Sequence, residues 1–156
     1  MNRSGNEVPA RGVRLGVDVG SVRVGVARSD PHSLLATPVA TLARDDSKQS
    51  DLDRLRELVQ ELNVVEVTVG LPRTLRGAVG SAAVAARSYG QLLATRIAPV
   101  PVVYVDERLT SVTANRMLAE RGIREKSRRS VVDQAAAVTI LQIRLDQVSA
   151  ALRSSG

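Results

Sequence analysis

Three acidic positions in this chain could form a catalytic metal site, although they lie far apart in the sequence. Asp18 interrupts an apolar, β-branched run. Asp106 and Glu107 end a second run of this kind, and Asp133 follows a basic stretch. Converging carboxylates raise one another's pKa, and a bound divalent cation removes that penalty. Two such ions can activate water and stabilise the leaving oxygen of a phosphodiester, so these residue types indicate metal-dependent phosphodiester hydrolysis.

Each of these acids also has a purely structural interpretation. The Asp18 side chain could accept amide hydrogens from the turn that follows it. Asp106 and Glu107 would be favourable at the N-terminus of a following helix, and Asp133 could complete a capping box that begins at Ser130. Because side chains alternate on a strand, only one of Asp106 and Glu107 would face a shared site. The residues alone leave open which one it is.

The elements that would position these acids follow from the apolar patterns and the turn signals. Three strand-like segments with short connections come first and indicate an antiparallel meander. They span residues 13–18, 22–27 and 37–43. Two further strands, over 64–69 and 101–105, alternate with helices. The helices are expected from Ser50, with capping-box spacing, over about 80–97, over 110–121 and from Ser130 onward.

This order predicts an α/β fold with a five-stranded mixed sheet. Three strands form the antiparallel meander, two are parallel, and helices cover both faces. Ligands bind beside the carboxyl ends of strands in such sheets, which is where the three acids would converge. The last helix is expected to bury the stripe Val131, Ala135, Val138, Leu141, Leu145 and Val148.

The composition narrows the possible chemistry and location. A chain of 156 residues indicates one domain, expected over 13–152, with a flexible N-terminal tail over 1–12 and a short C-terminal tail over 153–156. The absence of cysteine excludes disulfides and thiolate zinc sites, and the one histidine, His32, lies in an expected loop. Any metal must therefore be held by oxygen, which favours Mg²⁺ or Mn²⁺. With no signal peptide or apolar span, we expect a cytoplasmic protein with no membrane partner.

The charge indicates a nucleic-acid partner bound through its phosphates. The net charge is +6, although an excess of arginine can also reflect codon bias. Only Tyr89 and Tyr104 are aromatic, so the chain lacks a platform for stacking bases. Runs of charged residues often only face solvent, but two basic runs, over 73–76 and 121–129, flank the predicted acidic site. The candidate nucleic-acid-binding residues are Arg23, Arg73, Arg76, Arg108, Lys126, Arg128 and Arg129.

Four segments together resemble the YqgF/RuvX family, which is similar in fold to ribonuclease H and to the junction resolvase RuvC. They are residues 15–27, 69–72 with Gly77, 105–111 and 132–137. The resemblance implies a Mg²⁺- or Mn²⁺-dependent nuclease with Asp18, Glu107 and Asp133 as catalytic metal ligands. It favours Glu107 over Asp106, and it implies a role in maturing the 5′ end of pre-16S ribosomal RNA or in resolving four-way DNA junctions. The loop over 73–76 departs from the family pattern.

The same residues also allow other interpretations. The turn after Asp18 also resembles the first phosphate loop of actin-like and sugar-kinase ATPases, but those folds need two domains. A basic RNA-binding factor without catalysis is a further alternative, although the connector over 122–129 is long for a helix-turn-helix. Resolving a junction requires two symmetric cuts and normally a dimer, whereas trimming RNA requires one site, so either a monomer or a homodimer is expected.

Overall fold

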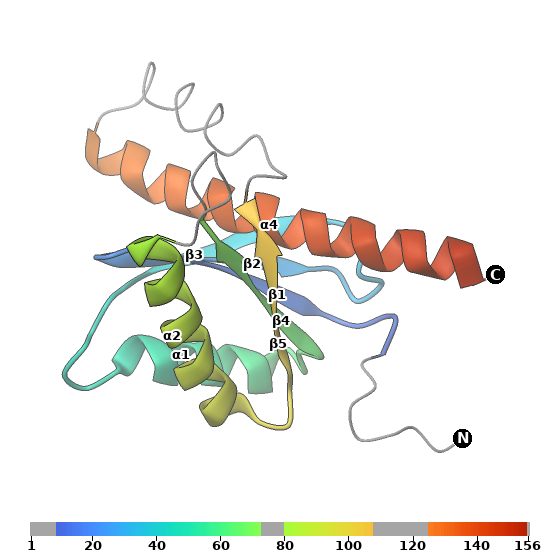
Figure 1. Cartoon of the computed structure of the whole chain (residues 1–156), viewed down its shortest axis with the longest axis horizontal. Coiled ribbons are helices and arrows are strands. Elements are labelled where there is room, and N and C mark those ends of the chain that lie inside the picture. The colour runs from blue at the N-terminus through green and yellow to red at the C-terminus, as the bar shows by residue number, and fades with distance from the viewer. Residues whose placement is uncertain (1–8, 73–79, 108–124, 156) are drawn as a thin grey trace.

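A five-stranded mixed sheet forms the centre of the molecule (Figure 1). The computed structural model describes residues 9–72, 80–107 and 125–155, and within 125–133 and at Ser155 it describes the backbone only. The strand order is β3-β2-β1-β4-β5. The strands are β1 (Arg14–Val19), β2 (Arg23–Ser29), β3 (Ala36–Ala43), β4 (Glu66–Leu71) and β5 (Val102–Asp106).

The pairing of the strands confirms the predicted topology. β1 is central, antiparallel to β2 and parallel to β4, while β3 and β5 form the two edges. In this register Asp18 is paired with Gly25 of β2, and Val17 is paired with Val69 of β4. Asp106, the last residue of β5, is paired with Leu71. The carboxyl ends of the three parallel strands therefore meet at one edge of the sheet, as the sequence predicted.

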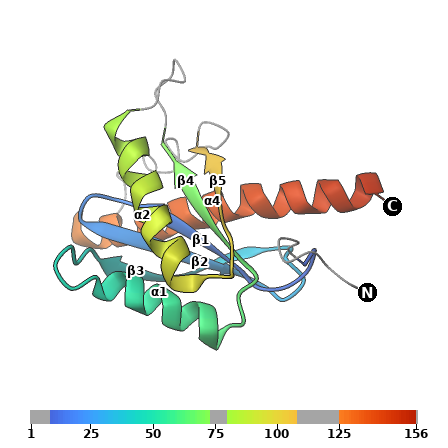
Figure 2. The same ribbon diagram turned by 60° about the horizontal axis from the view of Figure 1, so that its bottom comes forward.

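Helices cover both faces of the sheet. Figures 1 and 2 show α1 (Ser50–Glu61) and α2 (Ser81–Ile97) on one face and the long α4 (Glu125–Ser155) across the other. The larger core lies under α1 and α2 and includes Leu15 and Val17 of β1. A smaller core lies under α4 and includes Leu141 and Leu145. No helix in the described ranges is both long and apolar enough to span a membrane.

The helix α4 packs directly against the backbone of β1. A Cβ atom added to Gly16 would lie 2.6 Å from the Cβ of Leu141 and 2.7 Å from the carbonyl oxygen of Ala137. This close approach leaves no room for a side chain at Gly16. The fully buried positions are Ala136, Ala137, Ile140, Leu141 and Leu145. Of the predicted stripe, Leu141 and Leu145 are buried, while Ala135, Val138 and Val148 are partly buried and Val138 packs against the core under α4. The side chain of Val131 lies outside the described residues.

Two helix starts differ from the predicted capping boxes. The residue before α1 is Gln49, in the left-handed region with φ 58°, and it makes no side-chain cap. The Ser50 hydroxyl instead donates to Oδ2 of Asp45 at 2.7 Å. The helix α4 begins at Glu125, so Ser130 and Asp133 are not at a helix N-terminus and the proposed capping box is wrong.

The early start of α4 changes the setting of one basic cluster. Lys126, Arg128 and Arg129 lie on the helix rather than in a loop before it. At its other end α4 continues to Ser155, so residues 153–155 are helical. The helix expected over 110–121 falls outside the described residues.

Candidate active site

Asp18 lies at the carboxyl end of the central strand, on the face that α4 covers. Its side chain alternates with Gly16, whose Cβ position faces α4, so the two residues share this face. Asp18 is 8% exposed, while its neighbours on the opposite face, Val17 and Val19, pack into the larger core. A carboxylate at this depth costs several kcal/mol unless it is hydrogen-bonded, paired or bound to a metal.

Glu107, rather than Asp106, is the second acid that reaches this face. A Cβ atom added to Gly70 would lie 3.1 Å from Cγ of Glu107 and 2.4 Å from Cδ1 of Ile140 in α4. The Glu107 side chain therefore lies over β4 on its α4 side. Since Val17 is paired with Val69, Gly70 is the residue of β4 next to Asp18. Glu107 therefore lies on the sheet face that carries Asp18.

A row of residues extends across the sheet from these acids toward β3. Asp18 is paired with Gly25, and Gly25 is paired with Thr41 of β3. From α4, Nε2 of Gln134 donates to Oγ1 of Thr41 at 3.2 Å. The described part of the site therefore holds small or polar residues in one line between the sheet and the helix.

The third predicted acid, Asp133, precedes Gln134 on α4. It lies four residues before Ala137, whose carbonyl oxygen is at the Gly16 contact, so its backbone is about one turn from the sheet contact. Its side chain lies outside the described residues. Among the side chains that are described, no group of three potential metal ligands occurs, and Asp18 and Glu107 are the described members of the predicted set.

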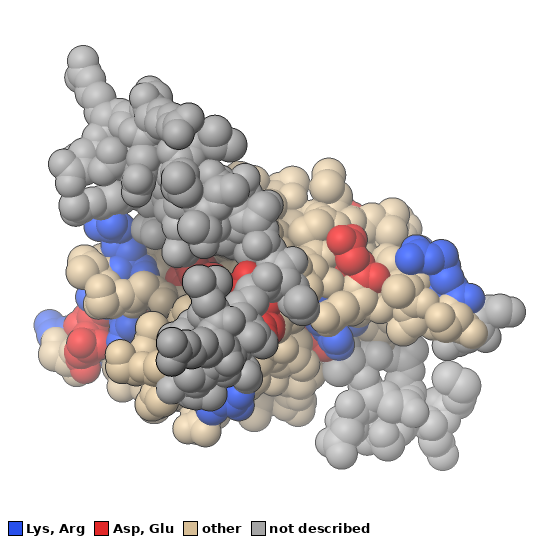
Figure 3. Space-filling view, turned by 45° about the horizontal axis from the view of Figure 1, so that its top comes forward, with Lys and Arg blue, Asp and Glu red and all other residues tan. Residues whose placement is uncertain are grey.

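The predicted nucleic-acid-binding residues fall into three groups. Arg23 begins β2 and alternates with Gly25, so it lies on the face that carries Asp18. The side chains of the basic cluster on α4 lie outside the described part, and so do Arg73, Arg76 and Arg108 entirely. Figure 3 shows acidic side chains near the middle of one face, with further acidic and basic side chains toward its margins.

The opposite end of β1 carries a second polar cluster that the sequence analysis missed. Arg14 and Glu66 are paired across β1 and β4, and Glu66 is fully buried. Nε of Arg14 donates to Oε1 of Glu66 at 3.1 Å, while Nε and Nη2 of Arg144 donate to its two oxygens at 2.8 and 2.9 Å. The hydrogen bond with Glu66 raises the pKa of Arg144. The sequence carried a signal for this pair, because β1 begins with Arg14 and the parallel strand β4 begins with Glu66.

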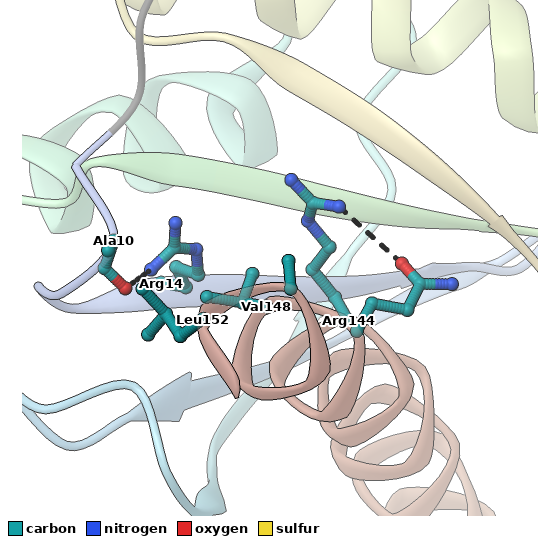
Figure 4. Close-up of a pocket in the computed structure, with 7 residues that line it drawn as sticks. Ala10, Arg14, Arg144, Val148 and Leu152 are labelled. Atoms are coloured by element: carbon teal, nitrogen blue, oxygen red, sulfur yellow. Dashed lines mark hydrogen bonds between the residues drawn. The ribbon is translucent and has the colours of Figure 1, made fainter. Parts of the chain in front are cut away.

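A cavity of about 230 Å³ lies beside this cluster (Figure 4). Its lining includes Arg14 and Arg144 together with apolar residues of α4 such as Val148 and Leu152. Both guanidinium groups already bind the carboxylate of Glu66. Arg14 also donates to the carbonyl of Ala10 at 3.2 Å. The cavity lies at the end of the sheet away from Asp18. Its two guanidinium groups therefore bind parts of the protein itself.

Comparison with known proteins identifies the family. A model of the RuvX family, described as Holliday junction resolvase, matches residues 12–147. The chain belongs to the RuvX family. A RuvX relative from Mycobacteroides abscessus, named "Putative pre-16S rRNA nuclease", is 55% identical over 146 residues, which make up 94% of this chain and 88% of the relative. A relative of the same name from Mycobacterium leprae (strain Br4923) is 59% identical over 148 residues, or 95% and 80% of the two chains.

A solved structure supports the fold assignment of this RuvX chain. T. thermophilus RuvC in complex with a Holliday junction substrate matches with a TM-score of 0.54 and 16% sequence identity, covering 88% of this chain and 96% of that chain. This likeness concerns the fold alone. The predicted family, the ribonuclease H-like α/β fold and the nuclease class are confirmed.

Membership in the RuvX family implies that a divalent metal ion takes part, and the described residues fit one. Asp18 and Glu107 supply carboxylate oxygens, the ligands that such hard cations prefer. Gly70 has no Cβ, which lets the Glu107 side chain lie close over β4 at this point. The described residues therefore provide oxygen donor atoms of the kind that such an ion needs.

Proposed function

We propose that this protein is a Mg²⁺- or Mn²⁺-dependent nuclease that processes the 5′ end of pre-16S ribosomal RNA in the cytoplasm. One structural observation carries the proposal: Glu107 reaches over Gly70 onto the sheet face that carries Asp18. The relatives that share more than half of its sequence bear the name of this activity.

The acids and the basic residues have separate roles in this proposal. Asp18, Glu107 and Asp133 hold the metal, whose chemistry is to activate water and to stabilise the leaving oxygen. Arg23 and the basic residues predicted on the loops and on α4 bind backbone phosphates. Such contacts position the substrate without reading its sequence.

Resolution of four-way DNA junctions is the second candidate, because the family description names that activity. A junction requires two symmetric cuts and therefore two active sites, which a homodimer supplies. The RNA activity requires only one site, so a monomer suffices. The cleavage products and the oligomeric state together distinguish the two candidates.

The decisive experiment compares cleavage of pre-16S RNA and of a four-way junction by the wild type and by Asp18→Asn, with Mg²⁺ or Mn²⁺. We expect metal-dependent cleavage of the RNA that the variant loses, while RNA binding persists because phosphate contacts come from other residues. Binding of RNA should weaken steeply with salt as counterions are released. Cleavage of the junction alone would favour the resolvase activity.

A matched control keeps the charge change and moves it away from the site. Asp146 is an exposed residue on α4 that accepts a hydrogen bond from Gln142. Asp146→Asn removes one negative charge, as Asp18→Asn does, and should cleave as the wild type does. Full cleavage by Asp18→Asn would contradict the catalytic role of Asp18. RNA binding without cleavage by the wild type itself would leave only the non-catalytic RNA-binding factor.

A further inference from the structure

Arg44 links the turn behind Asp18 to the helices on the opposite face of the sheet. It directly follows β3, and its backbone N–H donates to the carbonyl of Val22 at 2.8 Å. Its side-chain Nη1 donates to the carbonyl of Gly20 at 2.9 Å. Gly20 is two residues after Asp18, and its own N–H donates to the carbonyl of Arg23 at 2.8 Å. Arg44 therefore contacts the β1–β2 turn through both its backbone and its side chain.

The guanidinium group of Arg44 is held from the other side by α1 and α2. Asp51 of α1 is 4% exposed, and its Oδ2 accepts a hydrogen bond from the Tyr89 hydroxyl of α2 at 2.7 Å. Nε of Arg44 is 4.0 Å from the same Oδ2, and its Cζ lies 4.9 Å from the centroid of the Tyr89 ring. A chain of contacts thus runs from two buried helix residues, through one side chain, to the turn that follows Asp18.

We propose that Arg44 is a positioning residue that fixes the β1–β2 turn and thereby the Asp18 carboxylate toward the metal. This inference rests on the proposed function of Asp18. The last paired residues of the hairpin are Val19 and Val24, so the backbone beyond them depends on the turn contacts. A metal ligand must be held within a fraction of an ångström, and loss of a supporting contact reduces metal affinity or activity about 10- to 100-fold.

The planar fork of arginine suits this role better than a point charge does. Nη1 binds Gly20, Nη2 binds Asp46 at 3.2 Å, and Nε faces Asp51, so all three nitrogens have protein partners. Lysine has a single ammonium group and does not reproduce this arrangement. The Arg44 side chain is also only 22% exposed. Its protein contacts and its low exposure disfavour a contact with a substrate phosphate.

The test compares Arg44→Ala and Arg44→Lys with the control Arg54→Ala. Arg54 is 45% exposed on α1 and pairs only with Glu57 and Glu61 among the described residues, so its loss removes the same charge without touching the turn. Three measurements are made on folded protein: amide hydrogen exchange at Gly20, Mn²⁺ binding by calorimetry, and metal-free RNA binding over a salt series. Thermal unfolding establishes whether each variant is folded. If Arg44→Ala does not fold, the test relies on Arg44→Lys.

We expect faster exchange at Gly20 and Mn²⁺ binding weakened about 10- to 100-fold in both Arg44 variants, with cleavage reduced through kcat. RNA binding should match that of Arg54→Ala. Unchanged Gly20 exchange or Mn²⁺ affinity, with only a lower melting temperature, would overturn the proposal in favour of a structural role. A smaller salt dependence of RNA binding than in the control would overturn it in favour of a phosphate contact.

Asp18→Asn separates this inference from the proposed function. If that variant binds Mn²⁺ as the wild type does, Asp18 is not a metal ligand, and both the proposed metal site and the role of Arg44 toward it fail. If Asp18→Asn loses Mn²⁺ and the Arg44 variants retain it, the proposed function stands and only the role of Arg44 fails.

Discussion

The two ends of β1 place buried charges on the same sheet face but use them differently. At the start of the strand, Arg14 is 2% exposed, and a cation on each side satisfies the buried carboxylate of Glu66. At the end of the strand, Asp18 shares the face with a second carboxylate, Glu107, across Gly70. At the first end, opposite charges form buried ion pairs that join β1, β4 and α4. Like charges gather at the other, where a divalent cation is the natural complement.

The largest expected contrast comes from neutralising one acid at each end. Glu66→Gln should destabilise the protein by about 3 kcal/mol, because it breaks a buried ion pair and leaves guanidinium groups without their partner. Asp18→Asn should cost less stability than Glu66→Gln and lower cleavage at least about 100-fold, more than loss of a supporting contact does. Urea unfolding and cleavage per folded molecule measure the two effects. Equal loss of stability in both variants would remove the distinction between the two ends.

Two glycines under α4 sharpen the same comparison. Gly16→Ala and Gly70→Ala both force an added Cβ against α4, and each should cost about 1–3 kcal/mol. Only Gly70→Ala also displaces Glu107, so it should reduce cleavage per folded molecule much more than Gly16→Ala does. Thermal unfolding and single-turnover cleavage measure these effects. Gly80→Ala is the control for both, since nothing lies within 4 Å of its added Cβ.

On the other face of the sheet, Tyr89 contacts the buried carboxylate of Asp51 and the guanidinium group of Arg44. Burial, and then the hydrogen bond to Asp51, raises the pKa of Tyr89 well above its usual value. Since the folded pKa is the higher one, the stabilising contribution is complete below about pH 10 and is lost as the pH rises beyond it. In Tyr104→Phe, which leaves Tyr89 as the one tyrosine, phenolate absorbance should rise only as circular dichroism shows unfolding. Absorbance that rises in the folded state would contradict this burial.

The smallest expected effect is at an exposed carboxyl before α1. The Ser50 hydroxyl, and then the backbone N–H of Lys48, lowers the pKa of Asp45 from 3.8 to about 2. Because the folded pKa is depressed, its stabilising contribution is present above pH 3.8 and is lost as the pH falls toward 2. Ser50→Ala should raise the pKa of Asp45 toward 3.8, as measured by NMR titration. An unchanged value would show that the hydroxyl is not the cause.

The sheet could be predicted because its signals are local. β-branched runs separated by short turns define the meander, and the order of strands and helices then places the carboxyl ends of the parallel strands together. The choice between Asp106 and Glu107 could not be made from the residues alone, because it depends on how β5 ends beside Gly70. The family resemblance favoured Glu107, and the structure places it on the α4 face.

The features that the sequence did not reveal depend on contacts between distant segments. Arg44 is 24 residues from Gly20, and nothing in the loop around it indicates that partner. The start of α4 was misplaced because Ser130 has the spacing of a capping residue, while the helix in fact begins at Glu125. A local capping pattern therefore does not by itself determine where a helix begins.

The most direct test is the position of a bound ion. A crystal structure of the protein with Mn²⁺, read from anomalous scattering, should show a metal peak bound by carboxylate oxygens of Asp18, Glu107 and Asp133 at about 2.0–2.3 Å. Such a peak would join the three acids in one site. A fully occupied ion elsewhere, with these three carboxylates too far apart to share it, would contradict the proposed active site.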